Sequence, residues 1–241
     1  MKRLFISLTF FLTLTSFAVA QININLPKVT APGVKWAESY LFDKCNSFKI
    51  DFYAKNNELM KTVNYKTYYQ SKGADFVVKM LSEKNNGGME TILDKTNEVA
   101  IQIFGAGVMD TKPYYNAGGF KYPAESDLKK LEITATTETK KIAGYTCKKY
   151  TYTYKKIFGE VWITDDVKLP NDVGVFRAAK MAALHNTLSV SGFVMEMTTE
   201  DARGGKTVMT TLSLMANEKY TINLKGVDMN TALNKVNYYT F

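Results

Sequence analysis

Histidine is almost absent from the chain, whose 241 residues contain only His185. A Ser-His-Asp triad would have to use this residue, and no G-x-S-x-G motif accompanies it. The H-E-x-x-H, paired C-x-x-C and EF-hand spacings, which are the common sequence signatures of metal sites, are also missing. We therefore expect a protein that is not an enzyme, with no catalytic residue, no metal and no cofactor.

Long hydrophobic runs are confined to the N-terminus. After a basic start comes the apolar run 4–17, and Ala18–Ala20 stands just before Gln21, which is the layout of a cleavable secretory signal peptide. No later segment offers the roughly 18 uninterrupted apolar residues that a membrane-spanning helix needs. No cysteine follows the run, so we expect no lipid anchor. We predict that residues 1–20 are removed and that 21–241 form a soluble periplasmic or secreted protein.

Cysteine is nearly as scarce, because Cys45 and Cys147 are the only two. An oxidising compartment permits a disulfide between them. That bond would close a loop of about 100 residues and contribute about 4 to 5 kcal/mol in the chain-entropy model. Two buried free thiols are the alternative, since free cysteine often packs as a small hydrophobic residue. The sequence leaves both possibilities open.

Acidic residues are outnumbered, with 23 Asp and Glu against 31 Lys and Arg and a formal net charge of +8. Such a charge suits an anionic lipid or a polyanion. The lysines are nevertheless spread over expected turns and polar strand faces, which favours an ordinary solvated surface. Arginine is scarce and the protein is expected to be exported, so we expect no nucleic-acid partner.

Linkers rich in proline or serine are missing as well, and we expect one domain over 21–241. Tyrosine, threonine, valine, isoleucine and phenylalanine dominate short runs that are separated by glycine, asparagine and aspartate. This pattern is typical of antiparallel β-structure. Strands are expected at 48–54, 62–70 and 76–81, in a fold of the mainly β class.

Two of the expected hairpins are defined by a register that gathers apolar residues on one face. The first pairs Leu93 with Val99. The second has a loop around Arg203 and pairs Met195 with Leu212, so that polar residues such as Glu196 fall on the other face. Such alternation predicts an antiparallel sheet with one solvated face.

A third hairpin is expected to turn at 155–159 and to set Tyr152 opposite Trp162. Aromatic cross-strand pairs of this kind stabilise a sheet by roughly 0.2 to 1 kcal/mol each. Helical patterns are expected in two places only, at 34–45 and at 172–188, where Asp172 is a plausible N-cap. Proline and glycine predict a long loop between these elements, at 110–127.

The middle of the chain, with the segments YYQSKGADFVVKM and METILDKTNE, resembles an exported bacterial family known only as a domain of unknown function, number forty-four-twelve. The resemblance runs roughly from Tyr68 to Met197. The residues that carry it in the third hairpin region are Thr139–Ile142, Gly144–Cys147, Lys149, Tyr150 and Glu160–Thr164. The resemblance implies a fold similar to the periplasmic lipoprotein carriers (LolA/LolB-like), a curved antiparallel sheet that forms an unclosed barrel with one or two helices on its concave side. It implies no enzyme activity, and those carriers hold acyl chains in the hollow.

Three functions follow from these patterns. The first is a binding protein whose concave face holds a lipid, a lipoprotein acyl chain or another apolar ligand, because methionine and aromatic side chains suit an adaptable apolar pocket. The second is a ligand-free structural or interaction module with an envelope protein partner. An enzyme is the weakest alternative, since it needs His185 beside a nucleophile or carboxylate. The candidate ligand-binding residues are Tyr152, Trp162, Phe193, Met195, Met197, Leu212 and Leu214.

Overall fold

The computed structural model describes residues 32–81, 88–105, 113–122, 129–169, 190–231 and 236–237. The predicted signal peptide and the predicted helix at 172–188, which includes His185, lie outside the described residues. No helix long and apolar enough to cross a membrane occurs within the described ranges.

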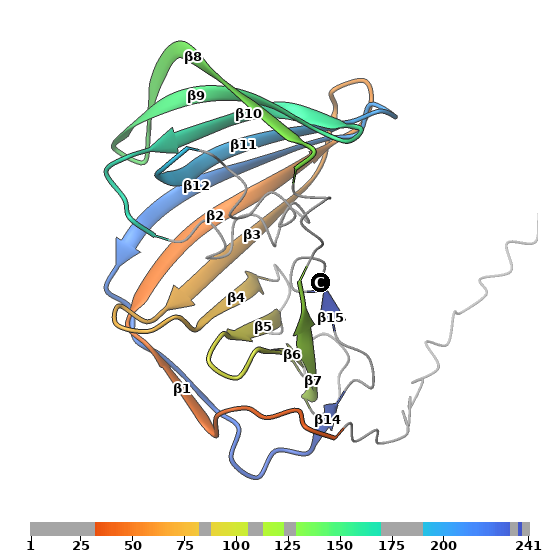
Figure 1. The fold of residues 1–241 in the computed structure, drawn as a ribbon, viewed down its shortest axis with the longest axis vertical. Coiled ribbons are helices and arrows are strands. Elements are labelled where there is room, and N and C mark those ends of the chain that lie inside the picture. The colour runs from red at the N-terminus through yellow and green to blue at the C-terminus, as the bar shows by residue number, and fades with distance from the viewer. Residues whose placement is uncertain are drawn as a thin grey trace, which may run out of the picture.

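One large sheet dominates the fold, and a two-stranded ribbon accompanies it (Figure 1). The strands in chain order are β1 (Ser39–Phe42), β2 (Lys44–Tyr53), β3 (Leu59–Tyr69), β4 (Phe76–Leu81), β5 (Met89–Asp94), β6 (Val99–Phe104), β7 (Tyr114–Lys121), β8 (Leu131–Ile142), β9 (Tyr145–Tyr154), β10 (Ile157–Thr164), β11 (Phe193–Asp201), β12 (Lys206–Ala216), β13 (Tyr220–Asn223), β14 (Met229–Thr231) and β15 (Val236–Asn237). The large sheet has the order β14-β7-β6-β5-β4-β3-β2-β12-β11-β10-β9-β8, with β15 also paired to β7, and β1 pairs with β13.

The sheet curls without closing into a barrel. Its neighbours are antiparallel, except that β14 and β15 run parallel to β7. Strand β8 forms one edge, and β14 and β15 lie at the other (Figure 1). The middle of the sheet is the long-range pair β2 and β12, in which Lys206 lies opposite Tyr53. The prediction of a mainly β fold with an open, curved antiparallel sheet is confirmed.

The predicted helix at 34–45 is wrong, since these residues contain β1 and the start of β2. Tyr40 and Phe42 are buried while Ser39 and Leu41 are exposed, and this alternation has the period of a strand. Helices on the concave side are not seen in the described part of the chain. The predicted loop at 110–127 is also wrong in part, because β7 lies inside it.

Two hydrophobic cores lie on the two faces of the sheet. The ribbon of β1 and β13 packs against the convex face of β3–β7, where Tyr40, Ile92 and Ile222 belong to one cluster. The other cluster runs along the sheet from β7 through β3 and β2 to β8, and it includes Leu93, Ile50 and Met197.

The prediction of one solvated face is therefore wrong for β3–β7, whose residues belong to both clusters. In the β5–β6 hairpin, Ile92 lies opposite Ile101 and Asp94 opposite Val99, one residue away from the predicted pairing of Leu93 with Val99. The carboxylate of Asp94 accepts hydrogen bonds from the backbone and side chain of Asn97 at 2.8 and 2.7 Å, which fixes a shorter turn than predicted. Both faces of these strands are consequently apolar.

The ribbon is tied to the sheet by buried polar contacts. The hydroxyl of Tyr40 donates to Asp94 Oδ2 at 2.7 Å and accepts from the Ala37 backbone N–H at 3.0 Å. Burial, together with the hydrogen bond to Asp94, raises the pKa of Tyr40 well above its ordinary value, so the phenol stays neutral. At the border of the ribbon, the ring of Tyr220 stacks on Tyr68 with centroids 4.3 Å apart.

We expect Tyr40→Phe to lower the free energy of unfolding by about 1.5 to 3 kcal/mol, because it removes a buried hydrogen bond to a charged acceptor. Tyr122→Phe is the matched control: that side chain is 50% exposed and its substitution should cost less than about 0.5 kcal/mol. Urea unfolding of both variants measures the difference. Equal stability of the two variants would contradict the anchoring role of Tyr40.

Candidate functional site

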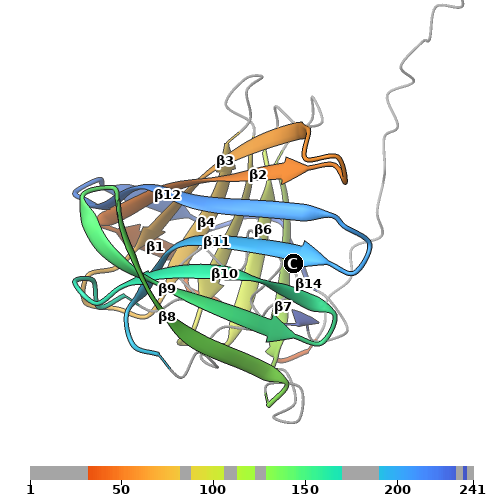
Figure 2. The ribbon, with the colours of Figure 1, turned by 90° about the horizontal axis from the view of Figure 1, so that it is seen from above.

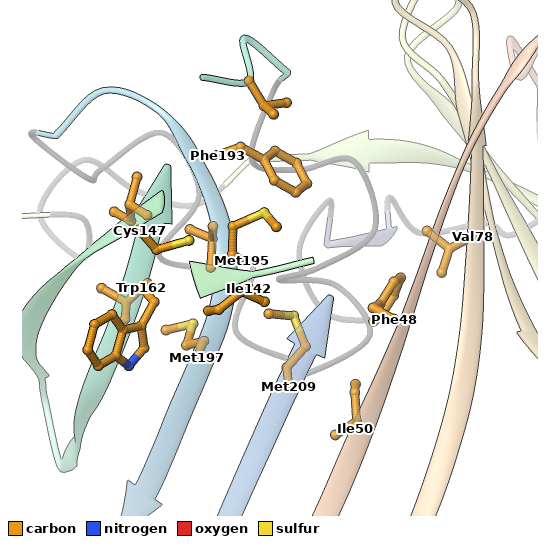
Figure 3. Close-up of a cluster of buried hydrophobic side chains, with 14 of the residues drawn as sticks. Phe48, Ile50, Val78, Ile142, Cys147, Trp162, Phe193, Met195, Met197 and Met209 are labelled. Atoms are coloured by element: carbon orange, nitrogen blue, oxygen red, sulfur yellow. The ribbon is translucent and has the colours of Figure 1, made fainter. Parts of the chain in front are cut away.

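A row of four apolar side chains crosses the concave face. Successive cross-strand partners are Val161 on β10, Met197 on β11, Met209 on β12 and Ile50 on β2. Each is at most 2% exposed. Figure 3 shows Met197, Met209 and Ile50 in the same buried cluster. We name this row and its same-face neighbours Phe48 and Tyr65 the methionine face; the Phe48 and Tyr65 rings stack with centroids 5.1 Å apart.

The β11–β12 turn decides which residues reach this face. Glu200 pairs with Lys206, which leaves a short loop in which Gly204 has φ +79°. The Asp201 carboxylate accepts the backbone N–H of Arg203 at 2.7 Å and of Gly205 at 3.1 Å. The resulting register differs by one residue from the prediction, so Met209 lies opposite Met197. Met209 is not among the predicted site residues; a hairpin loop that ends in glycine is the sequence signal that would identify it.

Tyr152 lies on the same side of the sheet as Met197, although its predicted pairing with Trp162 is wrong. It is opposite Gly159, because the hairpin turns at Lys155 and Lys156 rather than at the predicted 155–159. A Cβ at Gly159 would come within 3.2 Å of the Tyr152 ring and 1.9 Å of the Thr198 carbonyl oxygen. Glycine therefore permits close strand approach here and does not form the turn. The Tyr152 hydroxyl donates to that same carbonyl oxygen at 3.0 Å.

Met195 and Phe193 are buried next to a bulge in β11. The register between β10 and β11 shifts after Trp162, so that Glu196 lies opposite Trp162 but Val194 lies opposite Ile163. The strict alternation of faces breaks at such an extra residue. Phe193, Val194 and Met195 are accordingly all at most 1% exposed.

Trp162 lies on the opposite face from Met197. Its neighbours across the sheet are Lys149 and Glu196. The Lys140 ammonium lies 4.2 Å from the centre of the tryptophan ring and 2.6 Å from a Glu196 carboxylate oxygen. Lys149 also bridges to Glu160 at 2.8 Å. These paired charges cover Trp162, which is 8% exposed and belongs to the same buried cluster as Met197.

The two predicted leucines are placed differently. Leu212 is 50% exposed, because it shares the outer face with Thr210, the partner of Glu196. It is therefore not part of the methionine face, and its predicted position opposite Met195 is wrong. Leu214 is partly buried and packs against the cluster that contains Met197.

Two buried hydroxyl groups interrupt the apolar character of the concave side. Thr211, opposite Phe48, and Thr67, opposite Asn46, are 3% and 0% exposed. Among the residues that the structure describes, their Oγ1 atoms have no hydrogen-bond partner. An unsatisfied buried hydroxyl costs about 1 to 3 kcal/mol, so such groups call for an explanation.

Cys45 and Cys147 are free and buried, which contradicts the disulfide and agrees with the alternative of two free thiols. Their strands, β2 and β9, are four steps apart in the sheet. Four steps correspond to about 19 Å along the sheet, whereas a disulfide requires Cα atoms within about 7 Å. The two residues also belong to different hydrophobic clusters. Burial raises the pKa of the Cys45 thiol to about 12.

The described residues include no group of three or more His, Cys, Asp or Glu side chains that could hold a metal ion. The chemistry that the concave face offers is apolar contact, with two hydroxyl groups at one end.

No family model matches the chain, and no curated protein matches it. One matching solved structure is PNGF-II, with 13% identity over 78% of this chain and 31% of that chain and a TM-score of 0.41. A second is MucB in complex with MucA(peri), with 11% identity over 73% of this chain and 51% of that chain and a TM-score of 0.41. A third is the Pseudomonas aeruginosa MucA/MucB complex, with 11% identity over 73% of this chain and 52% of that chain and a TM-score of 0.38.

This chain thus spans between about a third and about half of the length of those solved structures. Likenesses at this level carry no information about function. The resemblance to an exported family of unknown function stays a prediction.

We expect both cysteines to be hidden from a thiol reagent in the folded protein and to titrate as two thiols per chain in denaturant. The reaction of the folded protein should be at least about a hundredfold slower than that of a Thr146→Cys variant, whose new thiol replaces an exposed side chain on β9. With a reagent that releases a chromophore on reaction with a thiol, absorbance measures both the reaction rate and the number of thiols. A denatured chain with no titratable thiol would contradict this prediction and favour a disulfide between Cys45 and Cys147.

Proposed function

We propose that the chain is a non-enzymatic, exported binding protein that holds a lipid, an acyl chain or another apolar ligand against the methionine face. The observation that supports this proposal best is the row from Val161 to Ile50, which continues through Phe48 on the inside of an open, curved sheet. Side chains of this row are at most 2% exposed in the ligand-free chain, so a ligand would reach them by displacing the side chains that now cover them.

Methionine makes this face adaptable. Met195, Met197 and Met209 lie in one cluster with aromatic residues (Figure 3). Their unbranched thioether side chains change rotamer at little cost and follow the shape of a flexible apolar partner. Leucine or isoleucine in their place would give a more rigid surface.

The hydroxyl groups of Thr67 and Thr211 supply a polar end for the same ligand. Both lie on the concave side, on β3 and β12, with β2 between them. A carbonyl, carboxylate or phosphate oxygen of a lipid would accept their hydrogen bonds, and the cost of burying them would be recovered on binding. The proposed ligand is therefore an amphiphile rather than a pure hydrocarbon.

A ligand-free interaction module of the cell envelope is the second candidate. Close packing favours it, because Phe193 and Met195 are at most 1% exposed, as in an ordinary core. In that case the methionine face only stabilises the fold, and an envelope protein would bind elsewhere on the surface.

The two proposed functions differ in whether the protein carries a bound amphiphile when it is purified from the cell envelope. Native mass spectrometry of protein purified from the cell envelope, followed by organic extraction, should reveal a bound amphiphile. The double variant Thr67→Val and Thr211→Val keeps the side-chain shape and removes both hydroxyl groups. We expect it to lose at least about tenfold in ligand occupancy, the effect of about 1.4 kcal/mol, while the ligand-free form is as stable as before or more stable.

Thr198→Val combined with Thr210→Val is the matched control, because these threonines lie on the outer face beside Val208 and Glu196. The control should retain the ligand. A protein that carries no amphiphile from the envelope and takes up no added lipid would contradict the binding function and favour the interaction module.

A further inference from the structure

The ends of seven strands line up at one end of the large sheet. Across it, Leu131 pairs with Tyr154, Tyr154 with Ile157 and Ile157 with Asp201, and Lys206 pairs with Tyr53, itself opposite Leu59. The β9–β10, β11–β12 and β2–β3 turns therefore lie side by side, as Figure 2 shows. We name segments 54–61, 129–132, 155–158 and 200–206 the basic rim.

Positive charge is concentrated on the basic rim. Its four segments carry eight basic and four acidic residues, so they hold half of the net charge of +8 in a small part of the chain. Seven of the basic side chains are exposed and Lys206 is half-buried. The basic residues are Lys55, Lys61, Lys129, Lys130, Lys155, Lys156, Arg203 and Lys206.

One carboxylate of the rim, that of Asp201, is hydrogen-bonded to backbone N–H groups. The Asp201 carboxylate accepts two N–H groups of its own turn, and these hydrogen bonds hold its pKa below the ordinary value. Asp201 thus shapes the β11–β12 turn. Lys206 in turn lies over the Tyr53 ring, 5.8 Å from its centre, so neighbouring turns contact each other.

Exposed apolar side chains accompany this charge. Leu59 is 53% exposed, Met60 71% and Phe158 47%, and they stand on strand ends of the rim. They make up half of the large hydrophobic residues that are exposed in the described part of the chain. A soluble polyanion has no apolar region in which these side chains could be buried, whereas the interface of a lipid bilayer does.

We propose that the basic rim docks on the surface of an anionic phospholipid bilayer. Lysine and arginine side chains reach the headgroups, and Met60 and Phe158 enter the boundary between headgroups and acyl chains. Each basic residue near an anionic bilayer strengthens binding by about fivefold, and salt screens this attraction. Several such residues together with a few apolar ones give reversible binding without an anchor.

The test is co-sedimentation of the exported protein with two kinds of vesicle. The intact mass of the protein is measured first, to show that residues 1–20 are absent. One kind contains phosphatidylglycerol and phosphatidylcholine, and the other phosphatidylcholine alone. We expect binding to the first kind only, and a fall of at least about tenfold in the partition coefficient between about 0.1 and 0.5 M salt.

Charge variants locate the surface. Changing Lys55, Lys61, Lys156 and Arg203 to Gln should weaken binding by at least about tenfold. The control variant loses the same charge elsewhere, through Gln at the exposed positions Lys72, Lys141, Lys219 and Lys225. It should bind within about threefold of the unchanged protein. Absence of binding to anionic vesicles, or equal loss in both variants, would overturn the proposal.

Apolar variants separate a bilayer from a soluble polyanion. Met60→Ser with Phe158→Ser should reduce the binding that remains at high salt, whereas Leu41→Ser with Leu212→Ser should not, although these leucines are 67% and 50% exposed. Binding to soluble polyphosphate as strong as binding to vesicles, with no effect of the Met60 and Phe158 pair, would overturn the bilayer proposal in favour of a polyanion.

The outcome is independent of the proposed ligand. The rim variants leave the methionine face and Thr67 and Thr211 unchanged, so native mass spectrometry of the same variants reports ligand occupancy separately. A protein that carries an amphiphile but ignores vesicles would overturn only the docking proposal.

Discussion

Cross-strand register is the constraint on which the rest of the structure depends. In a sheet that is apolar on both sides over much of its width, a shift of one residue exchanges the two faces. The turns set that register through a few local contacts. Asp94 closes the β5–β6 turn on Asn97, and Asp201 closes the β11–β12 turn on Arg203 and Gly205. The position of Met209 on the concave face follows from the second of these turns.

The strand content could be predicted from the sequence, but the pairing could not. Strands 48–54, 62–70 and 76–81 are confirmed as parts of β2, β3 and β4, because their β-branched and aromatic residues alternate between turn residues. The predicted register of the β9–β10 hairpin is wrong because glycine was taken to mark its turn. Gly159 instead lies under the Tyr152 ring, and the actual turn contains Lys155 at φ +55°, which composition alone does not reveal.

The candidate site was predictable in part for the same reason. Tyr152, Met195 and Met197 were identified by their apolar pattern, whereas Met209 was assigned to the polar face by the shifted register. Leu212 and Trp162 show the opposite error. Both are large and apolar, yet the structure places them on the outer face, Leu212 exposed and Trp162 covered by Lys140. Residue type indicates burial, while only register tells which face is buried.

The pairing of β2 with β12 has a consequence for how the chain acquires its shape. Tyr53 and Lys206 are cross-strand partners in the central strand pair, and the β1–β13 ribbon pairs Tyr40 with Ile222. A chain that is synthesised from its N-terminus holds β2–β7 for most of that time without the strands that cover and continue them. Contacts between such distant segments slow folding. The early strands therefore remain open to association with other chains until the last fifth of the sequence is free, a period in which a holding chaperone has a surface to protect.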